Sequence, residues 1–232
     1  IKFNGSKEAY GRALRRHFFA TAQKDHNATA IALAHHAQDQ QETFFIRLIR
    51  GASLDGLAGM QPRNGAYIRP LLHTNKTDIL KWLDRHNISY LQDPSNQSDA
   101  FLRNRIRNTV IPALQAADSR FDHNFTKTHT KIQENALFIA SLATNAFDRA
   151  TTYKYNEKWL EIKALFDLDP TMQDRILVHW LCESGVPFEP TQAFLDEIKR
   201  FIQQPGSKTH QIKNSWHLVK KKQLVRIKKV IL

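Results

Sequence analysis

Short apolar runs alternate with amphipathic segments over residues 8–114, and this alternation constrains the fold more than any other feature of the sequence. Helical periodicity is present at Glu8–Ala22, from His35 to Arg50 and at Asn75–His86. Apolar runs typical of strands lie between these segments, at Thr29–Leu33, Tyr67–Leu72 and Ile88–Leu91. A chain that alternates helix and strand in this way predicts an α/β domain with a parallel sheet.

The alternation stops at Asp118–Asp122, and the rest of the chain reads differently. Apolar residues from Phe125 to Ala150 recur every three or four positions, which predicts one long helix. Three further helices are predicted at Trp159–Phe166, Met172–Glu183 and Thr191–Gln203. A small β-ribbon is predicted at Thr209–Lys213, Trp216–Lys220 and Leu224–Lys228. We therefore predict an α/β domain over residues 1–118 and a mainly helical domain, ending in a β-ribbon, over residues 119–232.

The chain is strongly basic, with 34 Lys and Arg against 22 Asp and Glu and a formal charge of +12. Such an excess favours a polyanionic partner such as RNA, DNA or a nucleotide, although a merely solubilising basic surface would have the same composition. The lysines of the predicted ribbon also have two interpretations, because they could contact RNA or form a charged sheet edge. They are Lys220, Lys221, Lys222, Lys228 and Lys229. The sequence has a single cysteine, which suits a reducing compartment, and it shows no signal peptide and no apolar run of about 18 residues. We therefore predict a cytoplasmic protein without membrane contact.

The stretch Ala34–Thr43 (AHHAQDQQET) carries the most chemistry. It follows the first predicted strand and enters a helix whose apolar stripe would be Phe45, Leu48 and Ile49. If that helix begins near His35, then His35, Asp39 and Glu42 share one face beside the carboxyl end of a strand, where open α/β sheets bind ligands. A solvated polar face is the alternative interpretation.

Two sets of arginines are candidates for phosphate contacts. Arg103 and Arg107 share one face of a predicted helix, while Asn104 and Arg105 point elsewhere. This helix follows a polar turn, Asp93–Asn96. Arg12, Arg15 and Arg16 line the first predicted helix. A solvated or salt-bridged cationic surface explains either set equally well.

Six motifs in this order resemble the bacterial tRNA(Ile)-lysidine synthetases, over roughly residues 8–114. They are the Arg12–Arg15 helix, Ala34-His35-His36 with Asp39 and Glu42-Thr43, Arg50-Gly51 with Gly56-Leu57-Ala58-Gly59-Met60, Arg69-Pro70-Leu71-Leu72, Asp93-Pro94-Ser95-Asn96, and Arg103-Asn104-Arg105-Ile106-Arg107 with Pro112. Beyond residue 118 the architecture resembles the helical tRNA-binding domain of that family.

The sequence departs from the family pattern at several places. Gln40 stands where the family has a second acidic residue, and Arg16 stands where an aromatic residue is usual. The Ser-Gly-Gly-x-Asp-Ser signature of the family's PP-loop, on its first strand, is expected before Ile1. The further domain of longer members is expected after Leu232.

The resemblance implies a two-step reaction. The carbonyl oxygen of the wobble cytidine in a CAU anticodon attacks the α-phosphate of ATP, which arrives with Mg²⁺, and pyrophosphate leaves. The side-chain amine of free lysine then displaces AMP to form lysidine, so that the tRNA reads AUA in place of AUG. The resemblance also implies a homodimer.

The resemblance also implies roles for the candidate residues. Asp39 and Glu42 are expected to be catalytic, with Glu42 gripping lysine and Asp39 accepting a proton, because a free amine with a pKa of about 10.4 arrives protonated. His35, Arg12, Arg15 and Arg105 are expected to bind the nucleotide. The expected substrate contacts are Arg103, Asn104, Arg107 and Arg50.

Three other functions stay open at this point. One is a metal-dependent phosphohydrolase whose ligands are His35, His36, Asp39 and Glu42, although the chain has no His-Asp pair and no His-Glu-x-x-His motif. Another is a tRNA thiolase of the same PP-loop class, but such enzymes commonly carry several cysteines and this chain has one. The last is a non-catalytic RNA-binding module.

Overall fold

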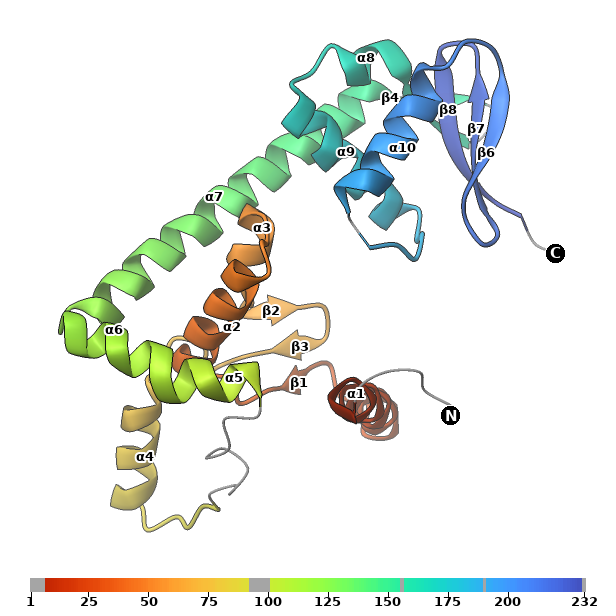
Figure 1. Ribbon diagram of the computed structural model, residues 1–232. Coiled ribbons are helices and arrows are strands. Elements are labelled where there is room, and N and C mark those ends of the chain that lie inside the picture. Colours follow the sequence, from red (N-terminus) through yellow and green to blue (C-terminus); the bar gives the residue numbers. More distant parts are fainter. Residues whose placement is uncertain (1–6, 92–100, 155–156, 190, 231–232) are drawn as a thin grey trace. The chain divides into compact units, whose positions relative to one another are not determined.

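The structure is a computed structural model that describes residues 7–91, 101–154, 157–189 and 191–230. The chain forms two compact units, Ile1–Glu134 and Asn135–Leu232, which are described in turn (Figure 1). Their mixture of helices and sheets confirms the predicted α/β domain followed by a largely helical region that ends in β structure. Among the described residues, no helix has both the length and the apolar character needed to span a bilayer.

Three short strands form the sheet of the first unit, in the order β1 (Ile31–Ala32), β3 (Tyr67–Ile68) and β2 (Arg63–Asn64). β1 and β3 pair in parallel, as the sequence predicts, whereas β2 is an unpredicted antiparallel neighbour of β3. Both predicted strands are longer than the observed ones. The chain turns at Pro70 because proline has no N–H with which to continue a ladder.

The predicted strand at Ile88–Leu91 is wrong. This segment has no regular structure, and the side chains of Ile88, Tyr90 and Leu91 are exposed. A strand needs a neighbour to pair its backbone N–H and C=O groups. No such neighbour pairs with this segment in the part of the chain that the structure describes.

Helices surround this sheet in the first unit. They are α1 (Lys7–Asp25), α2 (Ala37–Ile49), α3 (Leu54–Leu57), α4 (Lys76–Arg85), α5 (Leu102–Arg105), the π-helical turn η2 (Ile106–Val110), α6 (Ile111–Ala117) and the first half of α7 (Phe121–Ala150). The residues that join α5, η2 and α6 are themselves helical, so these three form one continuous helical segment. The π turn ends two residues before Pro112, which has no N–H to give to the carbonyl four residues back.

Helix α2 buries a different face from the predicted one. Leu48 and Ile49 are 50% and 62% exposed, whereas the buried positions are the polar run Gln40–Thr43. Phe44 and Phe45 do pack inward. Their rings contact an aromatic cluster on α7 formed by Phe121, Phe125 and His129. Partners from distant parts of the chain hold Gln40, Gln41 and Glu42 of this polar run in the interior.

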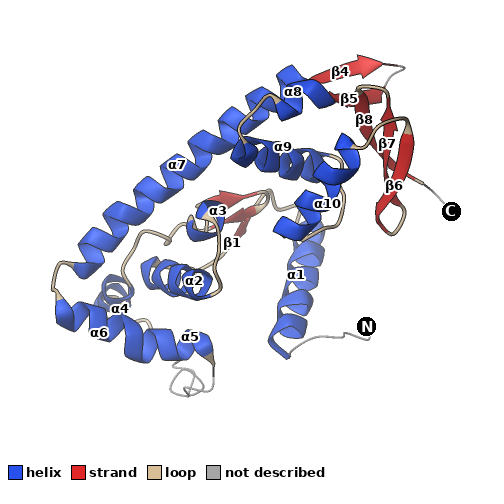
Figure 2. Ribbon diagram, turned by 45° about the horizontal axis from the view of Figure 1, so that its top comes forward, coloured by secondary structure: helices blue, strands red, loops and turns tan. Residues whose placement is uncertain are grey.

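The second unit packs helices against an antiparallel five-stranded sheet (Figure 2). The strand order is β4 (Thr151–Lys154), β5 (Glu157–Glu161), β8 (Leu224–Lys229), β7 (Trp216–Lys221) and β6 (Lys208–Lys213). The helices are the second half of α7, α8 (Ile162–Phe166), α9 (Pro170–Glu183) and α10 (Gln192–Gln203). The predicted ribbon is therefore confirmed. The hairpin of β4 and β5 was not predicted, and the expected helix at Trp159–Phe166 is a strand up to Glu161.

One lysine of the ribbon is not available for RNA contact. Lys220 is only 6% exposed, and its ammonium group donates to the carbonyl of Ile202, at 2.5 Å, and to that of Gln204. These carbonyls lie at the end of α10, where helix carbonyls lack partners of their own. Burial, together with the nearby Lys208, lowers the pKa of Lys220. Lys220 is therefore a structural link between the sheet and α10.

Candidate active site at the start of helix α2

The first turn of α2 fixes the position of Asp39. The helix begins at Ala37, with His36 as its N-cap, and the backbone N–H of His36 donates to Asp39 Oδ2 at 3.0 Å. A carboxylate three positions into a helix is stabilised there by this bond and by the positive end of the helix dipole. The Asp39 side chain is 13% exposed, so it remains partly open to solvent.

His35 precedes the helix, so the prediction that it shares a helical face with Asp39 and Glu42 is wrong in this respect. It nevertheless lies in the same charged environment. Burial lowers the pKa of His35, the nearby Asp39 opposes this effect, and Arg69 and Arg103 add to it. We therefore expect a neutral imidazole at neutral pH, close to one carboxylate and two guanidinium groups.

Glu42 lies one turn after Asp39 and is completely buried. Arg107 holds both of its oxygens, with Nε at 2.6 Å from Oε1 and Nη2 at 3.1 Å from Oε2. This hydrogen bonding raises the pKa of Arg107. Arg103 lies farther away, with Nη1 at 3.8 Å from Asp39 Oδ1 and Nε at 3.7 Å from Glu42 Oε2. We call Asp39, Glu42, Arg103 and Arg107 the charge cluster.

The helical segment formed by α5, η2 and α6 brings the two arginines together, as the predicted spacing requires. Ile106 and Ile111 are buried and anchor this segment. Arg103 and Arg107 project from one face toward α2. Asn104 is buried, whereas Arg105 is exposed and lies outside the charge cluster.

The other candidate residues that the structure describes lie outside the charge cluster. Arg15 is exposed on α1, and the side chain of Arg12 lies outside the described residues. Arg50 follows the far end of α2, eleven residues beyond Asp39, which is about 16 Å along the helix axis. The motif Asp93–Asn96 also lies outside the described residues. The roles assigned to these residues stay predictions.

Sequence reasoning assigned no role to Arg69, whose charge contributes to the lowered pKa of His35. Its Nη1 donates to the carbonyl of Gln61 at 2.9 Å. Among the described residues, its buried Nε has no hydrogen-bond partner, and the same holds for Nδ1 of His35 and of His36. Buried nitrogens without partners are costly unless a ligand or water satisfies them. The signal in the sequence was the Arg69-Pro70-Leu71-Leu72 motif itself.

The unexpected Gln40 has a structural explanation. Its Nε2 donates to the Met60 carbonyl at 2.7 Å, and its Oε1 accepts from the Met60 N–H at 2.8 Å. Gly59, in the left-handed region at φ +72°, lies so close that a Cβ there would be 2.7 Å from Gln40 Oε1. From α7, Gln133 donates to the carbonyls of Ala58 and Met60. The segment Ala58–Met60 is therefore a tight turn held by polar side chains.

Replacement of Gln40 by the acidic residue of the family pattern is expected to destabilise the first unit. Gln40→Glu removes the donor to the Met60 carbonyl and places a carboxylate against that oxygen, in a site that is 5% exposed. The expected loss is about 1–3 kcal/mol in the free energy of unfolding at neutral pH, measured by denaturant titration. The control is Gln38→Glu on the same helix. Its Oε1 accepts from the Lys76 N–H and would still do so, and the donor that it loses, Nε2 to Asn75 Oδ1 at 3.3 Å, lies in an exposed contact that water can replace. Equal losses for both variants would contradict the explanation.

Acidification is expected to destabilise the same unit through His129. Burial lowers the pKa of His129 below 6.5, as do the positive charges of His73 and Arg47, while its hydrogen bond to the Leu57 carbonyl acts in the opposite direction. The unfolded chain therefore takes up the proton first. The free energy of unfolding should fall as the pH drops from about 6.5 toward the lowered pKa, and this group adds no pH dependence above that range.

Thermal unfolding of the wild type and of His129→Gln, at about pH 7.5 and about pH 5.5, tests this expectation. The wild type should lose more stability on acidification than the variant does. A variant that loses as much as the wild type would show that another group carries the pH dependence.

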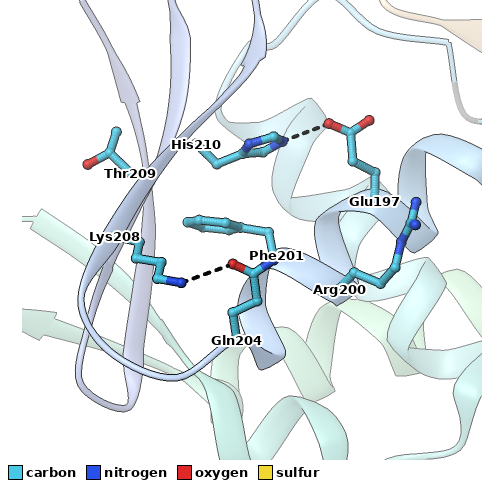
Figure 3. A pocket seen from close by; sticks show the side chains of 7 residues that line it. All are labelled: Glu197, Arg200, Phe201, Gln204, Lys208, Thr209 and His210. Atoms are coloured by element: carbon cyan, nitrogen blue, oxygen red, sulfur yellow. Dashed lines mark hydrogen bonds and ion pairs between the residues drawn. The ribbon is translucent and has the colours of Figure 1, made fainter.

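The second unit contains a separate pocket of about 380 Å³ between α10 and β6 (Figure 3). The His210 ring stacks on Phe201 with ring centroids 5.0 Å apart, and its Nε2 lies 2.7 Å from Glu197 Oε1. Lys208 donates to Gln204 Oε1 at 3.3 Å (Figure 3). Arg200 also lines the pocket, so basic side chains face solvent here.

Two family models match this chain. Residues 2–114 match the model of the PP-loop domain, and residues 160–225 match that of the TilS substrate binding domain. These matches confirm the resemblance drawn from the sequence motifs and the predicted class of fold.

Several curated proteins named tRNA(Ile)-lysidine synthase are similar to the chain. The protein from Bacteroides thetaiotaomicron is 28% identical over 97% of this chain and 50% of its own length. The protein from Geobacillus kaustophilus is 32% identical over 84% of this chain and 43% of its own length. The protein from Bacillus subtilis is 34% identical over 82% of this chain and 43% of its own length. The chain thus spans about half the length of these relatives, or somewhat less.

The alternative of a metal-dependent phosphohydrolase is not favoured. Within the described ranges, no three His, Cys, Asp or Glu side chains converge in a way that could hold a metal ion. Glu42 is held by Arg107, and His36 Nε2 lies 3.6 Å from Asp39 Oδ2. The relatives are named tRNA(Ile)-lysidine synthase, and this name does not describe a phosphohydrolase.

Proposed function

We propose that this chain supplies the catalytic and tRNA-binding parts of an enzyme that attaches lysine to the wobble cytidine of tRNA(Ile) with a CAU anticodon. The chain matches a PP-loop domain and, after it, a TilS substrate binding domain. The observation that carries this proposal is the presence of both domain matches, in this order, in one chain. The charge cluster gives the PP-loop domain a plausible site for an amine nucleophile.

The proposed reaction has two steps. In the first, the cytidine carbonyl oxygen bonds to the α-phosphorus of ATP and pyrophosphate leaves. In the second, the lone pair of the lysine side-chain nitrogen forms a bond to the activated ring carbon, and the bond from that carbon to the oxygen of AMP breaks. The nitrogen must lose its extra proton before it can attack, and we assign the acceptance of this proton to Asp39.

The two carboxylates have different tasks in this proposal. Asp39 is partly open to solvent and fixed by the N-cap of α2, which suits direct contact with the amine. The expectation that Glu42 grips lysine directly fits poorly with its complete burial and its two bonds to Arg107. We therefore assign Glu42 to holding the two arginines in place.

Contacts to ATP are proposed for the basic groups around His35. The unpartnered nitrogens of His35, His36 and Arg69 could accept or donate hydrogen bonds to a nucleotide beside the charge cluster. The described residues contain no group of metal ligands, so Mg²⁺ would be held mainly by the phosphates of ATP. The PP-loop backbone of the family would supply N–H groups for the pyrophosphate.

The remaining partners are proposed from the same reasoning. The net charge of +12 and the TilS substrate-binding match support tRNA as the polyanionic partner. Use of tRNA, ATP and free lysine fits a cytoplasmic enzyme. A homodimer is proposed from the family resemblance, and light scattering on the complete protein would test it.

Incorporation of labelled lysine tests the function directly. The complete gene product is incubated with ATP, labelled lysine and tRNA(Ile) that carries CAU, and with tRNA(Met) as the control that shares this anticodon. Label in tRNA(Ile) alone is expected, and it should require ATP. If intact protein binds this tRNA but never transfers lysine, a non-catalytic module or a thiolase becomes the better proposal.

A further inference from the structure

We propose that Arg103 is an exchangeable counter-ion: it neutralises Asp39 while the site is empty and moves to a substrate phosphate when the lysine amine arrives. The inference rests on the proposed function, since it assumes that lysine binds at Asp39. It adds that Arg103 couples the binding of lysine to the binding of phosphate.

The two arginines of the charge cluster are held very differently. Arg107 makes two hydrogen bonds to Glu42, at 2.6 and 3.1 Å. The Arg103 contacts of 3.7 and 3.8 Å are longer than hydrogen bonds, so charge attraction is what holds this side chain to the two carboxylates. Its side chain is also 36% exposed, against 28% for Arg107. Arg103 can therefore leave Asp39 and Glu42 without breaking a hydrogen bond to either.

The charge balance shows why one cation must leave. The cluster holds two carboxylates and two guanidinium groups, so its formal charge is zero. An added lysine ammonium would find Asp39 already neutralised and a like charge close by, and like charges in a partly buried site repel. Since His35 has a lowered pKa, it adds little positive charge of its own. Departure of Arg103 would restore one negative charge for the amine.

A destination for Arg103 lies close to it. Arg103 and Arg69 both lower the pKa of His35 through their charges, so both guanidinium groups lie within range of electrostatic interaction with this ring. Arg69 Nε and His35 Nδ1 are buried without partners among the described residues. A guanidinium fork matches the oxygens of a phosphate, so an α-phosphate here would attract Arg103 away from Asp39. Each ligand would then favour binding of the other.

Calorimetric titration of lysine into the complete protein tests the exchange, with and without a non-hydrolysable ATP analogue. In the wild type, the analogue should tighten lysine binding by about fivefold or more. In Arg103→Met, lysine should bind more tightly without the analogue, and the analogue should no longer change its affinity. The matched control is Arg85→Met, which removes an exposed arginine at the end of α4 and should behave as the wild type does.

The outcomes separate this inference from the function on which it rests. A wild type that binds lysine equally well with and without the analogue overturns the exchange, and this measurement needs no variant. Weaker lysine binding by folded Arg103→Met also overturns it, because Arg103 would then support the site. If the wild type transfers lysine to tRNA in either case, the proposed function stands. A wild type that neither binds nor transfers lysine contradicts the function as well.

Discussion

Asp39→Asn is expected to slow lysine transfer in the proposed reaction by about 10²–10⁴-fold, because an amide cannot accept the proton that the lysine amine must lose. The fold should survive, since the amide oxygen can still accept the N–H of His36 that Asp39 accepts at 3.0 Å. The first step should be far less affected, because Asp39 is not assigned to the attack on ATP. Single-turnover assays that separate pyrophosphate release from lysine incorporation measure both effects.

The matched control for this variant is Asp78→Asn. Asp78 occupies the same position, N3, of helix α4 that Asp39 occupies in α2, but it is exposed and distant in sequence from the charge cluster. The control should transfer lysine at the wild-type rate. Lysine transfer by Asp39→Asn within about threefold of wild type would rule out Asp39 as the proton acceptor, because the loss of a general base costs far more.

Arg107→Met is expected to lower the free energy of unfolding of the first unit by about 3 kcal/mol, because it leaves the carboxylate of Glu42 buried without its hydrogen-bonded partner. Glu42 is fully buried, while the Arg107 side chain is 28% exposed, so the lower end of the usual range for such pairs applies. Denaturant unfolding at neutral pH measures the loss.

Removal of both charges together should be much less costly. The double variant Glu42→Leu with Arg107→Met should recover most of the lost stability, since no uncompensated charge remains. Arg120→Met serves as the surface control. Its ion pair with Asp118 is similarly short, at 2.7 Å, but exposed, and we expect its loss to change stability very little. A double variant that is no more stable than Arg107→Met would argue against the ion-pair explanation.

Each half of the charge cluster could be predicted from the sequence because helical spacing determines it locally, but the contact between the two halves could not. Asp39 and Glu42 are one turn apart on α2, and Arg103 and Arg107 are one turn apart on the segment that faces it. The exact start of α2 could not be predicted, and that error placed His35 inside the helix. A shift of one or two residues at a helix end is too small for periodicity to detect.

The features that sequence reasoning missed depend on partners far away in the chain. Gln40 and Gln41 lie in a stretch whose alternative interpretation was a solvated polar face, yet both are buried: the backbone of Met60 pairs with the Gln40 amide, and Asp122 accepts from Gln41 Nε2. Leu48 and Ile49 read as core residues, yet they are exposed. Likewise, β5 could not be recognised from Trp159–Glu161, because its pairing with β8 joins residues more than sixty positions apart.

The buried Lys220 has a consequence for the ionic-strength dependence of the proposed RNA binding. Each lysine that neutralises a phosphate releases counterions, and on a plot of log affinity against log salt it steepens the slope by a little under one unit. Lys220 is buried, and it donates two of its three ammonium protons to carbonyls at the end of α10, so it is not accessible to a phosphate. A count of contacted phosphates taken from that slope will therefore be smaller than the number of lysines in the sheet.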